Sequence, residues 1–234
     1  MKYPRVLFDV EVQNDFFCPG GSCYKPAATE AARNVRRLFA WARAEKIPVM
    51  SIVLRQREGR RGPLAAVPHC IENTNGEKRP NGTVLRNYID LGMRGSTDLP
   101  GDIFSHYQHV IFERRLTDIF QHPRAERLLT EIQVDTFIVC GAGSARGIVE
   151  AVIGLRQRNF KVILAADAIL DLDDPRAEMA WLRMLAKSAV PLSTAEVIAG
   201  AQAPAEPGRL AKAQAGKAAL FRPAESPAGK AMST

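Results

Sequence analysis

The chain has 234 residues, of which 46% are hydrophobic and 24% are charged, and this composition is typical of one globular domain with a sizeable core. No run of about 18 consecutive apolar residues occurs and the apolar run near the N-terminus is short, so we expect no membrane span, no signal peptide and a cytoplasmic location. The net charge of +7 is spread along the chain without a basic stripe interleaved with aromatic residues, which argues against a nucleic-acid partner.

Apolar runs of strand length alternate along the chain with segments whose apolar residues recur at helical spacing. In chain order, the sequence predicts a strand at 5–12, a helix at 29–46, strands at 47–54 and 109–113, a helix at 124–133, a strand at 136–142, a helix at 144–159, a strand at 161–169 and a helix at 175–188. Residues 55–105 are rich in Gly, Pro, Asn and Arg and predict mostly loop, with a short strand at 83–87. Residues 191–200 are expected to close the domain.

Strands that are apolar throughout and alternate with helices predict a mainly parallel sheet that is covered on both faces. Right-handed crossovers then give a three-layer α/β/α sandwich with a Rossmann-like sheet. Ligands in such folds bind beyond the carboxyl ends of the strands. The segments to inspect for a site are therefore 9–15, 54–56, 113–117 and 141–147.

Residues 201–234 are rich in Ala, Pro and Gly and contain five basic and two acidic side chains. We expect them to form a disordered basic tail after a domain that spans residues 1–200. An alternative is that residues 208–222 form a short basic helix on a protein partner.

Four segments resemble the isochorismatase-like cysteine hydrolases, the superfamily that contains nicotinamidases, N-carbamoylsarcosine amidase and isochorismatase. These are VEVQNDFFCPGG at 10–21, VPHC at 67–70, FERRLTDIFQHP at 112–123 and the strand, loop and helix that follow Val139. They occur in the family's order and at plausible spacing. The resemblance covers roughly residues 4–199, and it implies the isochorismatase-like α/β fold.

The family's chemistry uses an aspartate, a lysine and a cysteine, and the resemblance places these positions on Glu11, Arg114 and Gly147. The cysteine attacks a carbonyl as a thiolate, and the aspartate carries the proton. Glu11 retains a carboxylate on a longer arm, and Arg114 retains a positive charge. Gly147 has no side chain, so the family's covalent route has no nucleophile here, and we expect space beside it.

Other nucleophiles and a metal site have little support in the sequence. Ser144 has no histidine near it in sequence, and the four cysteines, Cys18, Cys23, Cys70 and Cys140, have no clear activating partner. The Asp-x-His metal pair that some nicotinamidases have falls on Leu54 and Gln56, which leaves only His69. We therefore expect no metal and no cofactor.

The sequence predicts a pocket at the carboxyl ends of the strands, lined by Glu11, Arg114, Ala142, Gly143, Ser144, Arg146 and Gly147. An ion pair between Glu11 and Arg114 would compensate the buried carboxylate. Strand alternation places Asp9 on the same side as Glu11. Arg55 and Arg115 are further cations at strand ends, and Asp15 and Asp118 are interpreted as turn residues.

Two interpretations of the Glu11–Arg114 pair stay open, a core salt bridge alone or part of a ligand site. The functional prediction is a non-catalytic pseudoenzyme that binds a small anionic ligand or a protein partner, assembled as a homo-oligomer. An active amide hydrolase with a non-standard nucleophile is the first alternative. A structural subunit that docks through its basic tail is the second.

Overall fold

The computed structural model describes residues 2–59, 67–93, 95–114, 119–172 and 174–201. All of these lie in one compact unit, Met1–Ala203, which is distinct from a second unit, Pro204–Thr234. The predicted tail, apart from Ala201, and the predicted roles of Arg115 and Asp118 therefore fall outside the described residues. None of the helices in the described ranges is long and apolar enough to cross a membrane.

A seven-stranded sheet forms the centre of the described unit, and every pair of neighbouring strands is parallel. The strand order is β3-β4-β2-β1-β5-β6-β7. The strands are β1 (Lys2–Val10), β2 (Val49–Leu54), β3 (Tyr88–Asp90), β4 (His109–Arg114), β5 (Gln133–Ala142), β6 (Lys161–Leu170) and β7 (Val190–Leu192). Every residue of β2 and β4 is buried, which explains the continuous apolar stretches in these strands, such as Val110–Phe112 in β4.

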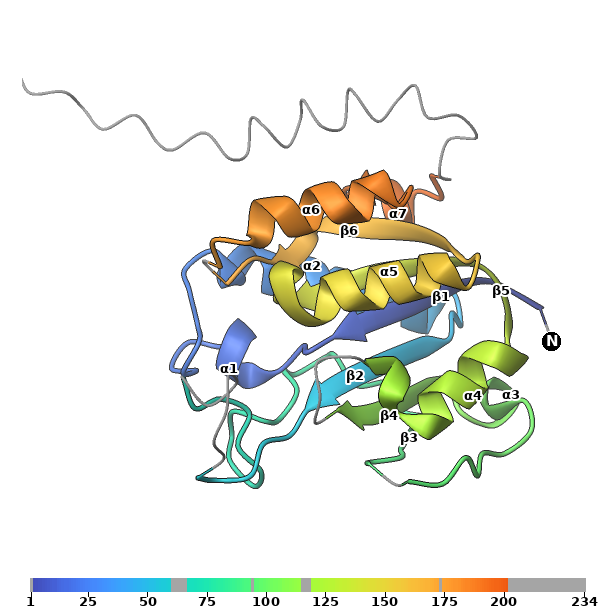
Figure 1. The fold of residues 1–234 in the computed structure, drawn as a ribbon, viewed down its shortest axis with the longest axis horizontal. Helices are drawn as coiled ribbons and strands as arrows, with labels where there is room; N and C mark the ends of the chain where they lie inside the picture. Colours follow the sequence, from blue (N-terminus) through green and yellow to red (C-terminus); the bar gives the residue numbers. More distant parts are fainter. Residues whose placement is uncertain (1, 60–66, 94, 115–118, 173, 202–234) are drawn as a thin grey trace, which may run out of the picture. The chain divides into compact units, whose positions relative to one another are not determined.

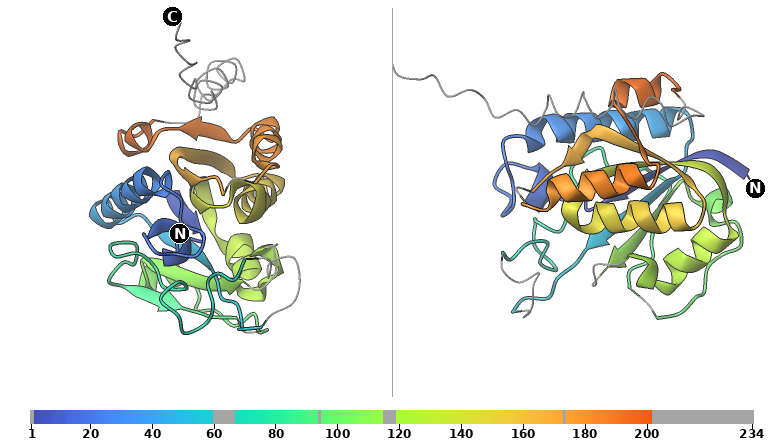
Figure 2. Two further views of the ribbon diagram at one scale, coloured as in Figure 1. Left: turned by 90° about the vertical axis from the view of Figure 1, so that its left-hand side faces the viewer. Right: turned by 45° about the horizontal axis from the view of Figure 1, so that its top comes forward.

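Helices cover both faces of the sheet, as Figure 1 and the end-on view of Figure 2 show. They are α1 (Asn14–Phe17), α2 (Ala28–Ala44), α3 (Ile103–His106), α4 (Pro123–Glu131), α5 (Val149–Gln157), α6 (Ala177–Ala186) and α7 (Thr194–Ile198), with the short turns η2 (Ile119–Gln121) and η3 (Ser144–Ile148). Two buried clusters result. One packs α3, α4, α5 and α6 against the sheet, and the other packs α1, α2 and α7 against the opposite face. The predicted three-layer α/β/α fold is confirmed.

Two predicted elements differ from the structure. The predicted short strand at 83–87 is wrong, because β3 begins at Tyr88. Leu85 is buried, but its backbone N–H donates to the ring of His109 instead of to a neighbouring strand. The predicted helix at 144–159 is interrupted, because Arg146 has non-helical dihedral angles (φ −127°, ψ −113°) that put a kink inside η3, and the regular helix α5 begins only at Val149.

The first strand ends earlier than predicted. β1 stops at Val10, and Glu11 has a φ of 55°, in the left-handed region that residues with a side chain seldom adopt. This turn also breaks the strand alternation on which the placement of Asp9 depended. The side chain of Glu11 therefore does not lie on the side that continued strand alternation would give it.

Candidate functional site

Three side-chain positions from distant parts of the chain meet at the carboxyl ends of the central strands. Glu11 follows β1, Arg114 ends β4, and Gly147 lies in η3 just after β5. A Cβ atom built on Gly147 would lie 3.5 Å from Nη2 of Arg114 and 3.6 Å from Oε1 of Glu11. The structure thus brings together the three positions that the sequence assigned to the family's triad.

Glu11 and Arg114 form a buried ion pair between Oε1 and Nη2. Their side chains are 1% and 3% exposed. The turn at Glu11 is fixed from β2, because the backbone N–H of Glu11 donates to the carbonyl of Ile52 at 2.8 Å. Burial lowers the pKa of Arg114 to about 10, and the positive charge of Arg146 contributes to this shift. Arg114 is therefore still charged at neutral pH.

Gly147 is closely packed, and the expectation of open space beside it is wrong. The same Cβ atom would lie 2.8 Å from Cγ1 of Val10, closer than real side chains approach one another. Val10 is itself 0% exposed. The place that a side chain at position 147 needs is therefore already taken by Val10.

The start of the helix after β5 presents polar groups beside this ion pair. Gly143 has a φ of 77°, and its carbonyl accepts from the backbone N–H of Arg146 at 2.9 Å. Ser144 is 1% exposed, and its Oγ has no hydrogen-bond partner among the described residues. The first N–H groups of a helix lack partners within the helix and attract anions. The N–H groups of Arg146 and Ile148 both donate to the carbonyl of Gly143, so the hydroxyl of Ser144 is the side-chain donor left without a partner in the described part of this turn.

Most of the cations around the site are neutralised by carboxylates. Arg55 is paired with Asp90 and also lies 3.4 Å from Glu113. Arg146 is the exception, because its Nε lies 3.9 Å from Asp174 and a third of its side chain is exposed. Arg146 is therefore the cation with the weakest compensation in the described part of the site.

All four cysteines have a thiol pKa above the ordinary value. Burial is the main cause for each of them, for the fully buried Cys70 and Cys140 and for the partly exposed Cys18 and Cys23. Cys140 packs inside β5, as its apolar strand position predicted. A reactive cysteine needs a lowered pKa. The environment of each described thiol therefore disfavours the reactive thiolate.

His69 takes part in local structure and not in a ligand cluster. Its Nδ1 lies within hydrogen-bond distance of the carbonyl of Val67, and its ring packs edge-on against Phe16 at 5.4 Å. Its own carbonyl accepts from the side chain of Gln56 at 2.8 Å. Burial lowers the pKa of His69, and the charge of Arg146 lowers it further. Within the described ranges, no three His, Cys, Asp or Glu side chains form a group that could hold a metal ion.

Asp9 does not join the Glu11 pair, which corrects its predicted placement. Asp9 is paired with Arg79 at 2.9 Å and accepts a hydrogen bond from the hydroxyl of Ser51, on the face of the sheet that α2 covers. Ser51 in turn lies 2.6 Å from Nε2 of His109. Sequence analysis missed Ser51, Arg79 and His109, because one lies in a loop and the others in apolar strands.

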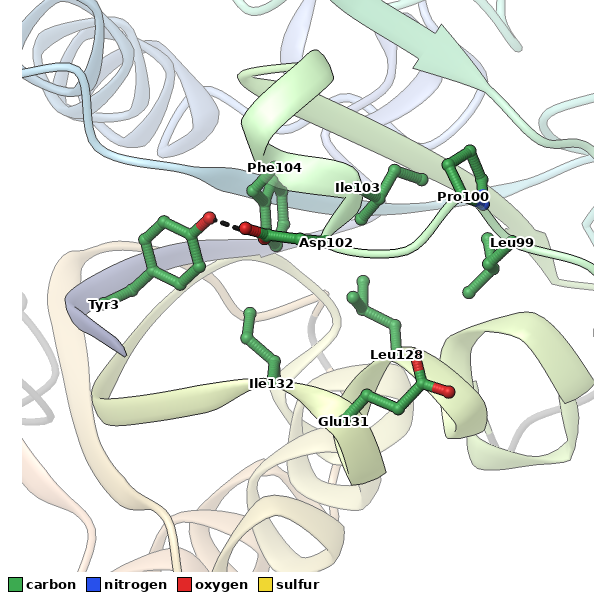
Figure 3. Close-up of a pocket in the computed structure, with 9 residues that line it drawn as sticks. All are labelled: Tyr3, Leu99, Pro100, Asp102, Ile103, Phe104, Leu128, Glu131 and Ile132. Atoms are coloured by element: carbon green, nitrogen blue, oxygen red, sulfur yellow. Dashed lines mark hydrogen bonds between the residues drawn. The ribbon is translucent and has the colours of Figure 1, made fainter. Parts of the chain in front are cut away.

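A separate pocket lies at the opposite end of the strands, near the start of β1 (Figure 3). Its lining includes Tyr3, whose hydroxyl donates to Asp102 at 2.9 Å, together with Leu128, Glu131 and Ile132. It holds about 90 Å³. This is well below the roughly 300–1,000 Å³ of ordinary small-molecule sites. We place the candidate site at the Glu11–Arg114 pair because the three positions assigned from the sequence meet there.

Comparisons with known proteins support the fold. Residues 96–196 match the isochorismatase domain. The fold is similar to nicotinamidase from Bacillus subtilis, with a TM-score of 0.62 and 15% identity over 81% of this chain and 99% of that one. It is also similar to N-carbamoylsarcosine amidase from Thermoplasma acidophilum, with a TM-score of 0.60 and 16% identity over 83% of this chain and 97% of that one. An isochorismatase family protein from Desulfovibrio vulgaris gives a TM-score of 0.62 and 19% identity, over 84% of this chain and 97% of that chain. No curated protein matches the sequence.

Proposed function

We propose that this chain, which carries an isochorismatase domain in the fold of these hydrolases, is a non-catalytic pseudoenzyme that binds a small anionic molecule. The observation that carries the proposal is the glycine at position 147. A side chain there would face both the carboxylate of Glu11 and the guanidinium of Arg114. Covalent acyl transfer needs a nucleophile at that place, and glycine supplies none.

No other described group is arranged to replace the missing nucleophile. The four thiols are held in their protonated form by burial. Ser144 is buried at the helix start, but it makes no hydrogen bond to a base in the described structure. Glu11 is already engaged by Arg114. These contacts disfavour the alternative, an amide hydrolase with a non-standard nucleophile.

An anionic ligand fits two polar groups of the site whose charge or hydrogen bonding is not fully satisfied by the described protein. Arg146 is a partly exposed cation, and the Oγ of Ser144 is a buried hydroxyl available to donate. Both lie in the short turn η3, which directly follows the carboxyl end of β5. A carboxylate or phosphate of small size is the ligand class that this combination recognises.

Phosphate or nicotinate is expected to raise the melting temperature of the wild-type chain, and Arg146→Ala is expected to abolish the rise. The melting temperature rises because the ligand binds only the folded state. The rise amounts to about 2–4 °C for every kcal/mol by which the bound ligand stabilises that state. Differential scanning calorimetry at increasing ligand concentration measures it. Arg55→Ala is the matched control, because Arg55 is compensated by carboxylates, and it should keep the rise.

The hydrolase alternative has its own readout in the same preparation. Release of ammonia from nicotinamide, abolished by Glu11→Gln, would contradict a non-catalytic role. A melting temperature that phosphate and nicotinate leave unchanged would contradict anion binding while leaving the absence of catalysis standing.

The cysteines are expected to react with iodoacetamide only at high pH. Because burial raises the pKa of Cys18 and Cys23, their thiolate fraction at neutral pH is below that of a free cysteine, and the alkylation rate should rise with a midpoint above about pH 8.5. Rates resolved by mass spectrometry between pH 6 and 10 test this, with N-acetylcysteine as the reference. A midpoint below pH 7.5 at any position would reveal an activated thiol and reopen the search for a nucleophile.

Homo-oligomer formation, a cytoplasmic location and a protein partner for residues 201–234 remain predictions from the sequence and its resemblance. The proposed ligand site does not depend on them.

A further inference from the structure

Residues 75–78 run beside the turn that follows β1. The backbone N–H of Asn14 donates to the carbonyl of Lys78 at 2.8 Å, and that of Asp15 donates to Gly76 at 3.1 Å. The side-chain amide of Gln13 donates to the carbonyl of Glu77 at 2.7 Å. This stretch is therefore attached to the strand that supplies Glu11.

The preceding residues of the same segment contact the turn that follows β1. The carboxylate of Asp15 accepts from the backbone N–H of Cys70 at 2.6 Å and from that of Ser22 at 3.0 Å. His69 is 3% exposed and lies within the electrostatic reach of Arg146. We call residues 67–79 the wall segment.

The wall segment buries little apolar surface that could stabilise its position. His69 and Cys70 are its buried residues, and the stretch from Ile71 to Lys78 is half-buried or exposed. The segment ends with Arg79, whose side chain is only 6% exposed. Arg79 is thus the second point at which this segment enters the core.

Arg79 meets a fully buried carboxylate there. Its Nη2 lies 2.9 Å from Oδ1 of Asp9, and its guanidinium stacks over the ring of Phe39 at 5.4 Å. Its Nε donates to the carbonyl of Thr83 at 3.0 Å. Asp9 is 0% exposed and lies in the central strand β1. Burial raises the pKa of Asp9 and the charge of Arg79 acts in the opposite direction, so Arg79 favours the ionised carboxylate.

Neutral neighbours complete the surroundings of Asp9. The ring Nδ1 of His109 accepts from the backbone N–H of Leu85 at 3.3 Å, so Nε2 carries the proton and donates to Ser51. The hydroxyl of Ser51 donates to Asp9. Burial lowers the pKa of His109 well below its ordinary value, which keeps the ring neutral. Arg79 is therefore the cation that balances Asp9 in the described core.

We propose that the Asp9–Arg79 ion pair is a latch that positions the wall segment, residues 67–79, against the turn that follows β1. Lifting the wall segment withdraws Arg79 and leaves the Asp9 carboxylate uncompensated inside the core. The free-energy cost of this unpaired buried charge opposes the opening of the wall segment. The apolar packing of the segment alone contributes little to that resistance. Asp9 and Arg79 are positioning residues in this proposal. It goes beyond the proposed function, because the segment packs on the residues that follow Glu11 and its position does not depend on a ligand.

Removing the latch is expected to expose the thiol of Cys70, which lies in the wall segment and is 0% exposed. In Arg79→Met the volume is kept and the charge is lost, and we expect the rate of Cys70 alkylation at pH 8 to rise at least tenfold. Cys140 is equally buried in β5 and should stay protected, which separates local opening from unfolding. Mass spectrometry of the labelled full-length chain measures both rates.

Three further variants make the test decisive. Arg79→Lys restores the cation and is expected to restore protection of Cys70. Asp9→Asn removes the other partner without changing the core volume and is expected to expose Cys70, which covers the case in which Arg79→Met does not fold. Arg124→Met is the matched control, because Arg124 is also buried but bonds to Leu91 and Ser96, away from the wall segment. It should leave Cys70 protected.

Two results would overturn the latch. One is protection of Cys70 at the wild-type level in both Arg79→Met and Asp9→Asn. The other is labelling of Cys70 and Cys140 at equal rates, which would show that the pair stabilises only the whole fold. The readout needs no ligand, so a failure here is distinguishable from a failure of the proposed anion binding.

Discussion

Arg114→Met is expected to lower the free energy of unfolding by about 3–5 kcal/mol, because it leaves the Glu11 carboxylate without its cation. Glu11 is 1% exposed, so water does not replace the lost partner. Methionine keeps most of the volume of the arginine stem, which limits the contribution of a cavity. Urea unfolding followed by circular dichroism gives the free energy and its dependence on denaturant.

The double variant Glu11→Gln/Arg114→Met separates charge from packing. Once neither side chain is charged, the desolvation cost of the pair is gone, and the stability should return to within about 1–2 kcal/mol of the wild type. A double variant as unstable as Arg114→Met would show that the arginine contributes through packing and its other contacts. That result would contradict the ion pair as the source of the effect.

Gly141→Ala is expected to lower the free energy of unfolding by about 4 kcal/mol, through backbone strain and a steric clash together. Gly141 has a φ of 128°, and it pairs with Val10 where β5 leaves the sheet toward η3. A Cβ atom there would overlap the carbonyl oxygen of Val10. Since that oxygen belongs to the central strand, neither partner can move without displacing Glu11 or the helix start.

Gly20→Ala is the matched control for this substitution. Gly20 also has a positive φ, of 87°, but no atom lies within 4 Å of the point that a Cβ atom would occupy, so alanine there meets only the conformational cost of about 1 kcal/mol. Thermal and urea unfolding of the two variants side by side isolate the clash. An equal loss in both would refute the close approach of β5 to Val10.

The fold was predictable because it depends on local patterns that recur along the chain. Apolar strands and amphipathic helices such as α2 and α4 alternate, and a parallel sheet follows from that alternation. The meeting of Glu11, Arg114 and Gly147 was predictable for a related reason. Parallel strands end at one edge of the sheet, so residues that follow their ends lie close together.

The other features of the structure around the site depend on contacts between residues that are far apart in the sequence, and such contacts leave no periodic pattern. Nothing near Arg79 indicates that it enters the core, because its partner Asp9 is 70 positions away in sequence and looks like part of an apolar strand. The left-handed turn at Glu11 is set by a hydrogen bond to Ile52, which only the folded sheet provides. Long-range polar pairing of this kind is visible only once the strands are in register.

The packing of Val10 against Gly147 also restricts how this protein can evolve. A single codon change that places cysteine at position 147 produces a crowded and strained intermediate, because Cγ1 of Val10 lies where the new side chain must begin. A cysteine here requires Val10 to shift, and shortening the valine would relieve the contact. The packing of Val10 against Gly147 thus disfavours the introduction of a thiol at this position.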